Sequence, residues 1–343
     1  MQFEDKNCPV IAVDDGYAQT KVYGFLPDGQ EVKMCIRSTV RQGRFGLGAI
    51  GGGGMIGMYE TENGPYTVSD NIPSVSTEFN EFHYSTNNRV LVNHALISAG
   101  FGGQKVNVIS GLPVANYFKD AERNDELIAR KVGNLSQAIT PANKEVEIAQ
   151  INEVQVGCQA VAAWVDYALD DQFKPKVDLK GDVAVVDIGG RTTDIATVVS
   201  GEHIDHARSG SINKGVLSVY EALQNQLRKK FDIEDDFSLA VLNAAVRNNR
   251  IDLWGKSQDV TKEVTEAVRM QQSQIGQAIQ RNLGSGASFK KVLFVGGGSA
   301  LFREIVEAYK QNGTVEADPE YSNVRGLYKY AMYQARETED ESV

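Results

Sequence analysis

The sequence is poor in cysteine and has no long apolar run. Its three cysteines, Cys8, Cys35 and Cys158, are odd in number and far apart among 343 residues. This spacing disfavours both a disulfide framework and a CxxC metal site, and it indicates a reducing, cytoplasmic environment. No segment reaches the roughly 18 consecutive apolar residues of a membrane span. The N-terminus also lacks an export signal pattern. We therefore expect neither a membrane protein nor a secreted one.

Basic side chains are outnumbered as well. The chain has 35 Lys and Arg against 45 Asp and Glu, a net charge of −10. Such a chain repels a phosphate backbone unless its basic residues cluster strongly, so we expect no direct contact with nucleic acid. The 42% hydrophobic and 23% charged residues are typical of globular proteins and exclude a disordered chain. The length predicts about two domains.

Apolar runs of strand type alternate with segments of helical period. The strand-like runs are 10–13, 106–109, 183–186, 195–199 and 292–295. Apolar residues fall on one helical stripe over 216–231 and on another over 260–283. This alternation predicts an α/β protein. The polar segment 170–182, which contains Pro175 and Gly181, is the predicted linker between two lobes.

An internal repeat is the most informative feature. Residues 13–22 (VDDGYAQTKV) align with 186–195 (VDIGGRTTDI) at a constant offset of 173. In each copy an apolar strand runs into Asp-x-Gly, a short polar turn and a second strand-like run. Two such hairpins, one in each lobe, predict duplicated domains that face one cleft.

The two turns have the chemistry of a phosphate site. Glycine lets backbone N–H groups approach an anion closely, and the hydroxyls of Thr192 and Thr193 add donors without negative charge. Asp14 and Asp187 would repel phosphate on their own, but Mg²⁺ held largely through water reverses that interaction. A single Asp-x-Gly is also typical of an ordinary hairpin turn. Its recurrence in register favours a two-sided site for metal and phosphates.

A third glycine cluster, 296–299 (GGGS), closes a strand and precedes a predicted helix. Bare backbone there accommodates adenine and ribose, with a helix N-terminus nearby; an ordinary βα turn is the alternative. Residues 210–215 (GSINKG) precede the helix predicted at 216–231 and are expected to meet the ribose or phosphates. Lys214 in this segment is either a contact or a solvated charge.

Two further segments leave alternatives open. Hydrolysis requires a carboxylate or amide near the γ-phosphate, but the sequence around Glu153 is by itself more typical of a surface residue, and only the resemblance given below makes Glu153 the candidate. The glycine-rich stretch 46–57 contains GxGxxG but follows a polar segment rather than a strand, which argues against a dinucleotide site. We predict an exposed loop or flap there.

Taken together, these residues resemble the superfamily of actin, the seventy-kilodalton heat-shock chaperones and sugar kinases, and within it the plasmid-segregation actins called ParM or StbA. The landmarks are 13–16 with Lys21, 91–96 with Gly100, 110–113 with Tyr117, 187–190 with Thr192 and Asp194, 295–298, and 323–327. The resemblance implies an actin-like fold with two duplicated lobes around a nucleotide cleft. It implies domain I from 1–171 and 322–343, and domain II from 172–321.

The resemblance also implies site residues. The first hairpin contributes Asp14, Asp15, Gly16, Tyr17, Gln19 and Lys21; the second contributes Gly189, Gly190, Arg191, Thr192 and Thr193; other turns contribute Gly210, Lys214, Gly215, Gly296, Gly297, Gly298 and Ser299. Asp14 and Asp187 are expected to hold Mg²⁺ through water, and Asp187 and Glu153 to be catalytic. Arg191 replaces the threonine of some relatives and is expected to add a phosphate contact or an interlobe pair. Asn152 replaces a proline that is common before the glutamate.

The function that the resemblance implies is an ATPase, with GTP open as an alternative, whose hydrolysis controls a filament that segregates plasmid DNA. Its expected partners are further copies of itself and a small DNA-binding adaptor on a plasmid centromere, and the acidic surface suits a basic adaptor. A sugar or acetate kinase of the same fold is the first alternative, but the sequence reveals no acceptor pocket. A chaperone-like ATPase is disfavoured because about 13 residues follow residue 330.

Overall fold

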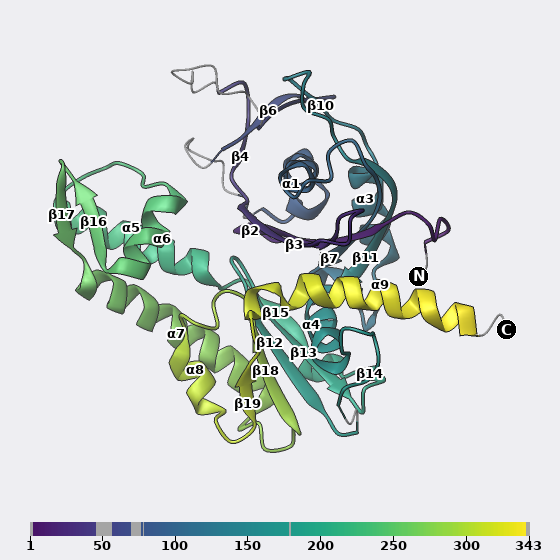
Figure 1. Cartoon of the computed structure of the whole chain (residues 1–343). Coiled ribbons are helices and arrows are strands. Elements are labelled where there is room, and N and C mark those ends of the chain that lie inside the picture. Colours follow the sequence, from purple (N-terminus) through teal and green to yellow (C-terminus); the bar gives the residue numbers. More distant parts are fainter. Residues whose placement is uncertain (1–2, 46–56, 70–76, 78, 178–179, 341–343) are drawn as a thin grey trace.

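The computed structural model describes residues 3–45, 57–69, 77, 79–177 and 180–340, with side chains up to 336. Two lobes are each built on a mixed sheet, with a central helix between them (Figure 1). The glycine-rich flap predicted at 46–57 lies outside the described residues except for Gly57, which precedes a strand. Among the described helices, none combines the length and apolar character that a bilayer span requires.

The first lobe contains a five-stranded sheet. Its strands, in spatial order, are β11 (Gln150–Cys158), β7 (Lys105–Leu112), β1 (Val10–Asp15), β2 (Gln19–Phe25) and β3 (Glu31–Arg37). β1 pairs antiparallel with β2 and parallel with β7. Side chains alternate along β1, so Ile11 and Val13 pack against one layer of helices while Ala12 packs against another.

Helices cover both faces of this sheet. α1 (Thr86–Ser98) and α3 (Asp125–Leu135) lie on the face of Ile11, and α4 (Gln159–Ala168) and α9 (Ser322–Asp340) on the face of Ala12. A smaller sheet beyond α1 contains β10 (Thr140–Pro141), β5 (Met58–Thr61), β6 (Gly64–Val68) and β4 (Val40–Gln42). The short elements are η1 (Phe82–Tyr84), α2 (Val114–Tyr117), β8 (Phe118–Lys119) and β9 (Glu122–Arg123).

The second lobe repeats the same arrangement. Its sheet contains β14 (His203–Ile204), β13 (Thr193–Val199), β12 (Val183–Ile188), β18 (Lys291–Val295) and β19 (Gly313–Val315), and β15 (Gly210–Ile212) also pairs with β13. β12 pairs antiparallel with β13 and parallel with β18, as β1 does with β2 and β7. The predicted strands and the predicted duplication are therefore confirmed.

Amphipathic helices share one core with the second sheet and extend to one side of it (Figure 1). They are α5 (Val216–Phe231), α6 (Leu239–Asn248), α7 (Thr261–Leu283) and α8 (Arg303–Ala308), with the hairpin of β16 (Arg250–Leu253) and β17 (Lys256–Asp259) beyond α6. The two segments in which apolar stripes predict helices, 216–231 and 260–283, form α5 and α7 respectively. Two further short helices are η2 (His206–Arg208) and η3 (Pro319–Tyr321).

α4 lies between the two sheets. Ala162 packs into the core of the first lobe, whereas Ala160 and Ala163 pack against Val185 and other residues of the second sheet. The chain then crosses from α4 to β12 through the predicted linker, and α9 returns to pack against α4 and β1. The domain limits at 171/172 and 321/322 remain a prediction, which this path supports.

Candidate functional site

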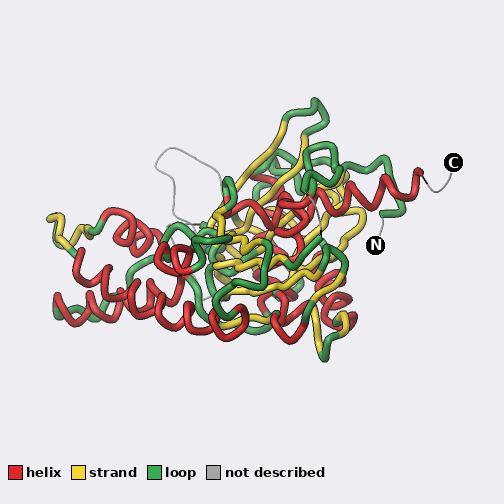
Figure 2. Tube along the Cα trace, turned by 90° about the horizontal axis from the view of Figure 1, so that it is seen from below, coloured by secondary structure: helices red, strands yellow, loops and turns green. Residues whose placement is uncertain are grey.

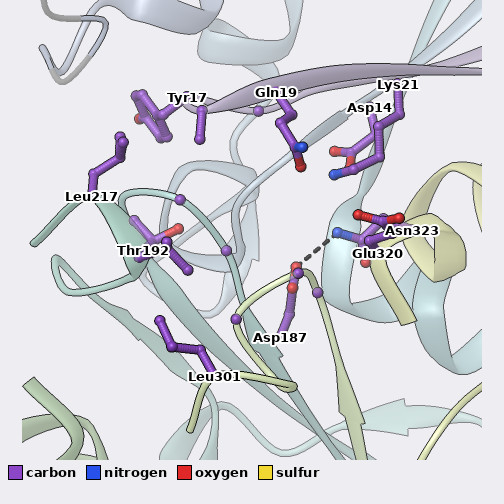
Figure 3. A pocket seen from close by; sticks show the side chains of 18 of the residues that line it. Asp14, Tyr17, Gln19, Lys21, Asp187, Thr192, Leu217, Leu301, Glu320 and Asn323 are labelled. Atoms are coloured by element: carbon purple, nitrogen blue, oxygen red, sulfur yellow. Dashed lines mark hydrogen bonds and ion pairs between the residues drawn. The ribbon is translucent and has the colours of Figure 1, made fainter. Parts of the chain in front are cut away.

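A cavity of about 510 Å³ lies between the two lobes. Its walls come from both Asp-x-Gly hairpins, the glycine loop after β18, α5, α6 and the start of α9 (Figure 3). Twelve predicted residues lie in its lining: Asp14, Gly16, Tyr17, Gln19, Lys21, Asp187, Gly189, Gly190, Thr192, Gly296, Gly297 and Gly298. The structure thus brings all three glycine sites to one cavity.

The two hairpins are equivalent in register. Asp14 pairs with Lys21 across β1–β2, and Asp187 pairs with Asp194 across β12–β13, so each pair keeps the offset of 173. Asp14 and Asp187 approach the cavity from opposite walls (Figure 3). The turns themselves meet: a Cβ added to Gly190 would lie 2.5 Å from Ala18 Cβ. Glycine is therefore required where one lobe touches the other.

Asp14 has two partners. Lys21 Nζ lies 3.4 Å from its Oδ2, and Gln159 Nε2 donates to its Oδ1 at 2.8 Å. Burial disfavours the ammonium of Lys21, but the carboxylate of Asp14 and the other acidic groups nearby, Asp187 and Glu320 among them, together outweigh burial and raise the pKa of Lys21. The first wall therefore offers a cation and an amide beside a carboxylate.

Asp187 is the more unusual carboxylate. Asn323 Nδ2, at the start of α9, donates to its Oδ2 at 2.7 Å. Burial and, second, the nearby Asp194 carboxylate raise the pKa of Asp187 to about 7. The ionised form of Asp187 is therefore destabilised when no cation is nearby, and a cation in the cavity would stabilise it.

The donor set fits Mg²⁺ held mainly through water. Carboxylate oxygens of Asp14 and Asp187 are the hard ligands that this ion prefers. Within the described residues no group of three His, Cys, Asp or Glu side chains converges on one point. An all-protein cage is thus absent from that part of the chain, whereas Mg²⁺ typically keeps several waters and substrate phosphates as ligands.

Asp15 does not line the cavity, which corrects its predicted nucleotide contact. Successive side chains of β1 point to opposite faces, so Asp15 points away from the side of Asp14. Its carboxylate is fully buried and accepts from Lys131 Nζ at 2.8 Å and from Ser110 Oγ at 2.6 Å. Burial opposes ionisation, but the Lys131 ammonium and the neighbouring His83 together outweigh burial and lower the pKa of Asp15. The pair stabilises the fold behind the turn.

Thr193 and Ser299 are also buried behind the lining. Thr193 Oγ1 donates to the carbonyl of Lys214 at 2.9 Å, and Ser299 Oγ donates to the carbonyl of Val295 at 2.5 Å. These hydroxyls therefore stabilise the turns instead of facing a ligand, contrary to the prediction.

The segment 210–215 lies behind the second turn as well. Gly210, Lys214 and Gly215 are not among the lining residues. The first N–H groups of α5, from Val216 and Leu217, donate to the carbonyls of Gly189 and Gly190 at 3.1 and 2.9 Å. Residues 210–215 therefore do not reach the cavity where they were predicted to meet a ribose or phosphates. The start of α5 instead fixes the Gly189–Gly190 turn in place.

Arg191 reaches across to the other lobe. Its Nη2 donates to Asn80 Oδ1 at 2.9 Å, and its guanidinium carbon lies 4.9 Å from the centroid of the Tyr17 ring. It is not in the cavity lining. Arg191 was predicted to make either a phosphate contact or an interlobe pair, and the structure shows the interlobe pair.

Glu153 lies away from the cavity, which corrects its predicted position. Its carboxylate accepts from the backbone N–H groups of Glu4 and Asp5 at 2.9 and 3.0 Å. It stands near the start of β11, whereas the cavity meets the other end of that strand, where Gln159 begins α4. The sequence analysis does not identify Gln159, because no sequence motif marks a glutamine at the start of a helix.

The sequence also left other lining residues unassigned. They include His83, Asp194, Tyr220, Asn243, Leu301, Glu320 and Asn323. Asp194 and Asn323 lie within landmarks of the resemblance but have no predicted role, and the others come from turns and helices without a local signature. Apolar residues such as Tyr220 and Leu301 give the cavity a side where a flat ring can pack.

Two family models match the chain. The model described as plasmid segregation protein ParM, N-terminal, matches residues 10–168. The model described as archaeal actin homologue MreB-like, C-terminal, matches residues 185–308. No curated protein matches the sequence significantly.

Solved actin-like structures share the fold over nearly the whole chain. The archaeal actin homologue Ta0583 in complex with ADP has 20% identity and a TM-score of 0.73, covering 95% of this chain and 99% of its own. A 15-stranded ParM filament from Clostridium botulinum has 17% identity, the same coverage and a TM-score of 0.73. Actin-like protein Alp7A has 14% identity, coverage of 97% and 98%, and a TM-score of 0.71. The N-terminal part of the chain thus matches the ParM model, the C-terminal part matches the model of archaeal MreB-like actin homologues, and nearly the whole chain has the actin-like fold.

Proposed function

We propose that this chain binds a nucleoside triphosphate with Mg²⁺ between its lobes, hydrolyses it, and forms filaments that segregate plasmid DNA. One observation carries the proposal: two Asp-x-Gly hairpins, equivalent in register, face one cavity from opposite walls. A triphosphate placed there contacts both lobes at once. The Ta0583 complex with ADP and the ParM filament among the structural neighbours support the nucleotide and the assembly.

The hairpin turns are the phosphate-binding elements of this proposal. Their backbone N–H groups around Gly16 and Gly189 approach the anion where no Cβ intervenes. Lys21 adds a positive charge, whereas the Thr192 hydroxyl at the lining donates to Asp194 Oδ2 at 2.8 Å and so orients the second hairpin. Asp14 and Asp187 hold the metal through water, and the metal, when bound, neutralises phosphate charge that these carboxylates alone would repel.

Gln159 takes the water-orienting role in place of Glu153. Its Nε2 is bonded to Asp14 Oδ1, which fixes the amide plane at the cavity wall. The amide oxygen is then the acceptor for a water beside the terminal phosphate. An amide orients this water without taking its proton, as in other triphosphatases that use glutamine.

The base and ribose occupy the side of the cavity formed by lobe II. A Cβ added to Gly297 would make only ordinary van der Waals contacts, with the nearest atom 3.9 Å away, whereas Gly296 and Gly298 pack tightly against β12. Tyr220 and Leu301 provide apolar contact. These features favour a purine ring, with ATP proposed and GTP the alternative.

Assembly follows from closure of the lobes. The nucleotide stabilises the closed form only while its phosphates contact both hairpins, so hydrolysis weakens the closed form. Closed copies stack head to tail and form an open helical polymer. A small DNA-binding adaptor on a plasmid centromere holds the filament end in the cytoplasm, and the net charge of −10 suits a basic adaptor.

Light scattering and phosphate release, measured together after Mg–ATP is added, test the proposal. Scattering that rises with ATP and decays as phosphate appears is the expected result. Phosphorylation of a small acceptor without scattering would instead support a kinase of the same fold. Asp187→Ala is the matched negative control, because it removes one metal-facing wall and should abolish metal-dependent nucleotide binding.

A further inference from the structure

The β16–β17 hairpin has an exposed tryptophan at its tip. Leu253 pairs with Lys256, so Trp254 and Gly255 form a two-residue turn, and their φ angles are +52° and +72°. Two-residue hairpin turns of this kind favour Asn-Gly or Gly-Gly, since a bulky side chain at positive φ is strained. Trp254 is also 71% exposed. In an isolated chain this residue is therefore unfavourable both in conformation and in solvation.

The tryptophan is nevertheless held in a defined position. Its ring meets Phe231, at the end of α5, edge to face with centroids 6.3 Å apart. Ile251, on the same hairpin, is buried in the core of lobe II. The hairpin is thus anchored to the lobe, and it presents the indole outward as a fixed apolar knob.

A second cavity lies on the first lobe, between the N-terminal segment and the C-terminal half of α9. Its volume is about 360 Å³. Its apolar wall is formed by Phe3, Pro9, Val10, Phe25, Tyr328, Ala331 and Met332. Lys6, Asp5 and Arg336 also line it, and the Arg336 guanidinium already lies 5.0 Å from the centroid of the Phe173 ring, so Lys6 is the cation left to face a further aromatic ring. Apolar walls beside cationic groups suit an aromatic ring, because a guanidinium or ammonium is attracted to the ring face.

The knob and the cavity lie at opposite ends of the molecule. The β16–β17 hairpin and the N- and C-terminal segments are at the two extremes in both views (Figures 1 and 2). Within one copy they cannot meet. Between two copies they form a contact of unlike surfaces, which repeats indefinitely unless the rotation closes a ring.

We propose that Trp254 of one copy docks into the cavity between the N-terminal segment and α9 of the next copy. The inference rests on the proposed filament and names one contact within it. Trp254 is the type of residue that dominates an interface when it enters a pocket, and docking removes its exposed apolar area from water. The occupant of the cavity is therefore a second copy of this chain.

Two variants test the contact, each removing one half of it. Trp254→Ser removes the knob, and Ala335→Trp fills the cavity with a side chain of its own. Each is expected to raise the critical concentration for Mg–ATP assembly at least about tenfold while nucleotide binding is retained. Met270→Ser is the matched control, since Met270 is an exposed apolar side chain on α7, 48% exposed, away from the hairpin tip.

A mixture of the two variants distinguishes unlike surfaces from like ones. Trp254→Ser retains the cavity and Ala335→Trp retains the knob, so an equimolar mixture should form a one-to-one dimer that neither variant forms alone. Analytical ultracentrifugation measures this. The contact is overturned if both variants assemble as the wild type does, or if each variant is monomeric and their mixture remains monomeric as well.

Tryptophan fluorescence gives a direct readout. The chain has two tryptophans, so Trp164→Phe leaves Trp254 as the only one. Its emission should shift to shorter wavelength on assembly, and an unchanged spectrum in sedimented polymer would overturn the proposal while leaving the filament intact. If the wild type never assembles with Mg–ATP, the filament proposal fails. In that case, self-association of concentrated wild type that Trp254→Ser abolishes upholds the contact, and its absence removes the contact as well.

Discussion

Adjacent side chains on β1 have opposite roles. Asp14 faces the cavity with Lys21 and Gln159, whereas Asp15 is buried against Lys131. Both are aspartates beside the same glycine turn, and strand alternation alone separates them. Function at this site therefore depends on which face a carboxylate reaches, and the motif itself does not specify this.

Gln159→Ala is expected to slow phosphate release about a hundredfold with little change in nucleotide affinity, because the amide orients water and does not hold the phosphates. Filaments of this variant should persist after ATP is added. Glu153→Ala is the matched control, since its carboxylate bonds to the N-terminal backbone and should leave phosphate release unchanged. Normal turnover by Gln159→Ala would remove the amide from the mechanism.

Asp187 should make Mg–nucleotide binding depend on pH. With its pKa raised to about 7, the folded apo protein holds a proton there that the unfolded chain, at 3.8, has lost. This group therefore stabilises the apo fold below pH 4, and its contribution is lost as the pH rises toward 7. Mg²⁺ competes with the proton, so affinity for Mg–ATP should fall up to about tenfold for each pH unit below 7.

Titration calorimetry measures this dependence between about pH 5.5 and about pH 8, a range that brackets the pKa of Asp187. Asp187→Asn, which keeps the shape but cannot titrate, is the control and should show weak binding with no such slope. A wild-type slope that persists unchanged in this variant would assign the titration to another group.

At the scale of elements, α4 and α9 approach closely enough to exclude a methyl group. A Cβ added to Gly326 of α9 would lie 1.7 Å from the carbonyl oxygen of Ala162 on α4. Gly133 of α3, by contrast, has no atom within 4 Å of an added Cβ. Both glycines lie inside helices, so their local helix propensities are alike and only the packing differs.

Gly326→Ala is expected to destabilise the fold by about 1 to 3 kcal/mol, since the two helices must separate to admit the methyl group. Gly133→Ala should stabilise it by about 0.5 to 1 kcal/mol, because alanine is the better helix former. Denaturant unfolding of both variants measures the difference. Equal effects would mean that α9 does not pack on α4 as described.

At the scale of the whole molecule, polar contacts join the two lobes on either side of the packed α4. Val114 N–H donates to Asp194 Oδ1 at 3.1 Å, and Arg191 bonds to Asn80 and covers Tyr17. Arg191 lies at the tip of the second hairpin, on the side of the cavity that faces lobe I. Its contacts hold the two turns together and require no nucleotide.

Arg191→Ala should therefore weaken the closed form and speed nucleotide dissociation about tenfold. This factor corresponds to the free energy of a charge-assisted hydrogen bond and a cation–π contact of modest strength. Stopped-flow displacement of a fluorescent nucleotide measures the rate. Lys214→Ala removes a charge near the same turn but outside the lining, and it serves as the control with an unchanged rate. If both variants release nucleotide at the wild-type rate, the pair does not contribute to closure.

Local pattern determined much of this protein. The β1–β2 and β12–β13 hairpins, their offset, the third glycine turn and the helices α5 and α7 follow from apolar periodicity and glycine placement, which act over a few residues. Tertiary structure alone decided which side chains share the cavity. Gln159 and Asn323 reach it, and Glu153 does not, because the sheet edge and the two packed helices set their positions. Contacts between segments far apart in the chain depend on how whole layers of helices and strands pack, and the spacing of residues within one segment does not predict this packing.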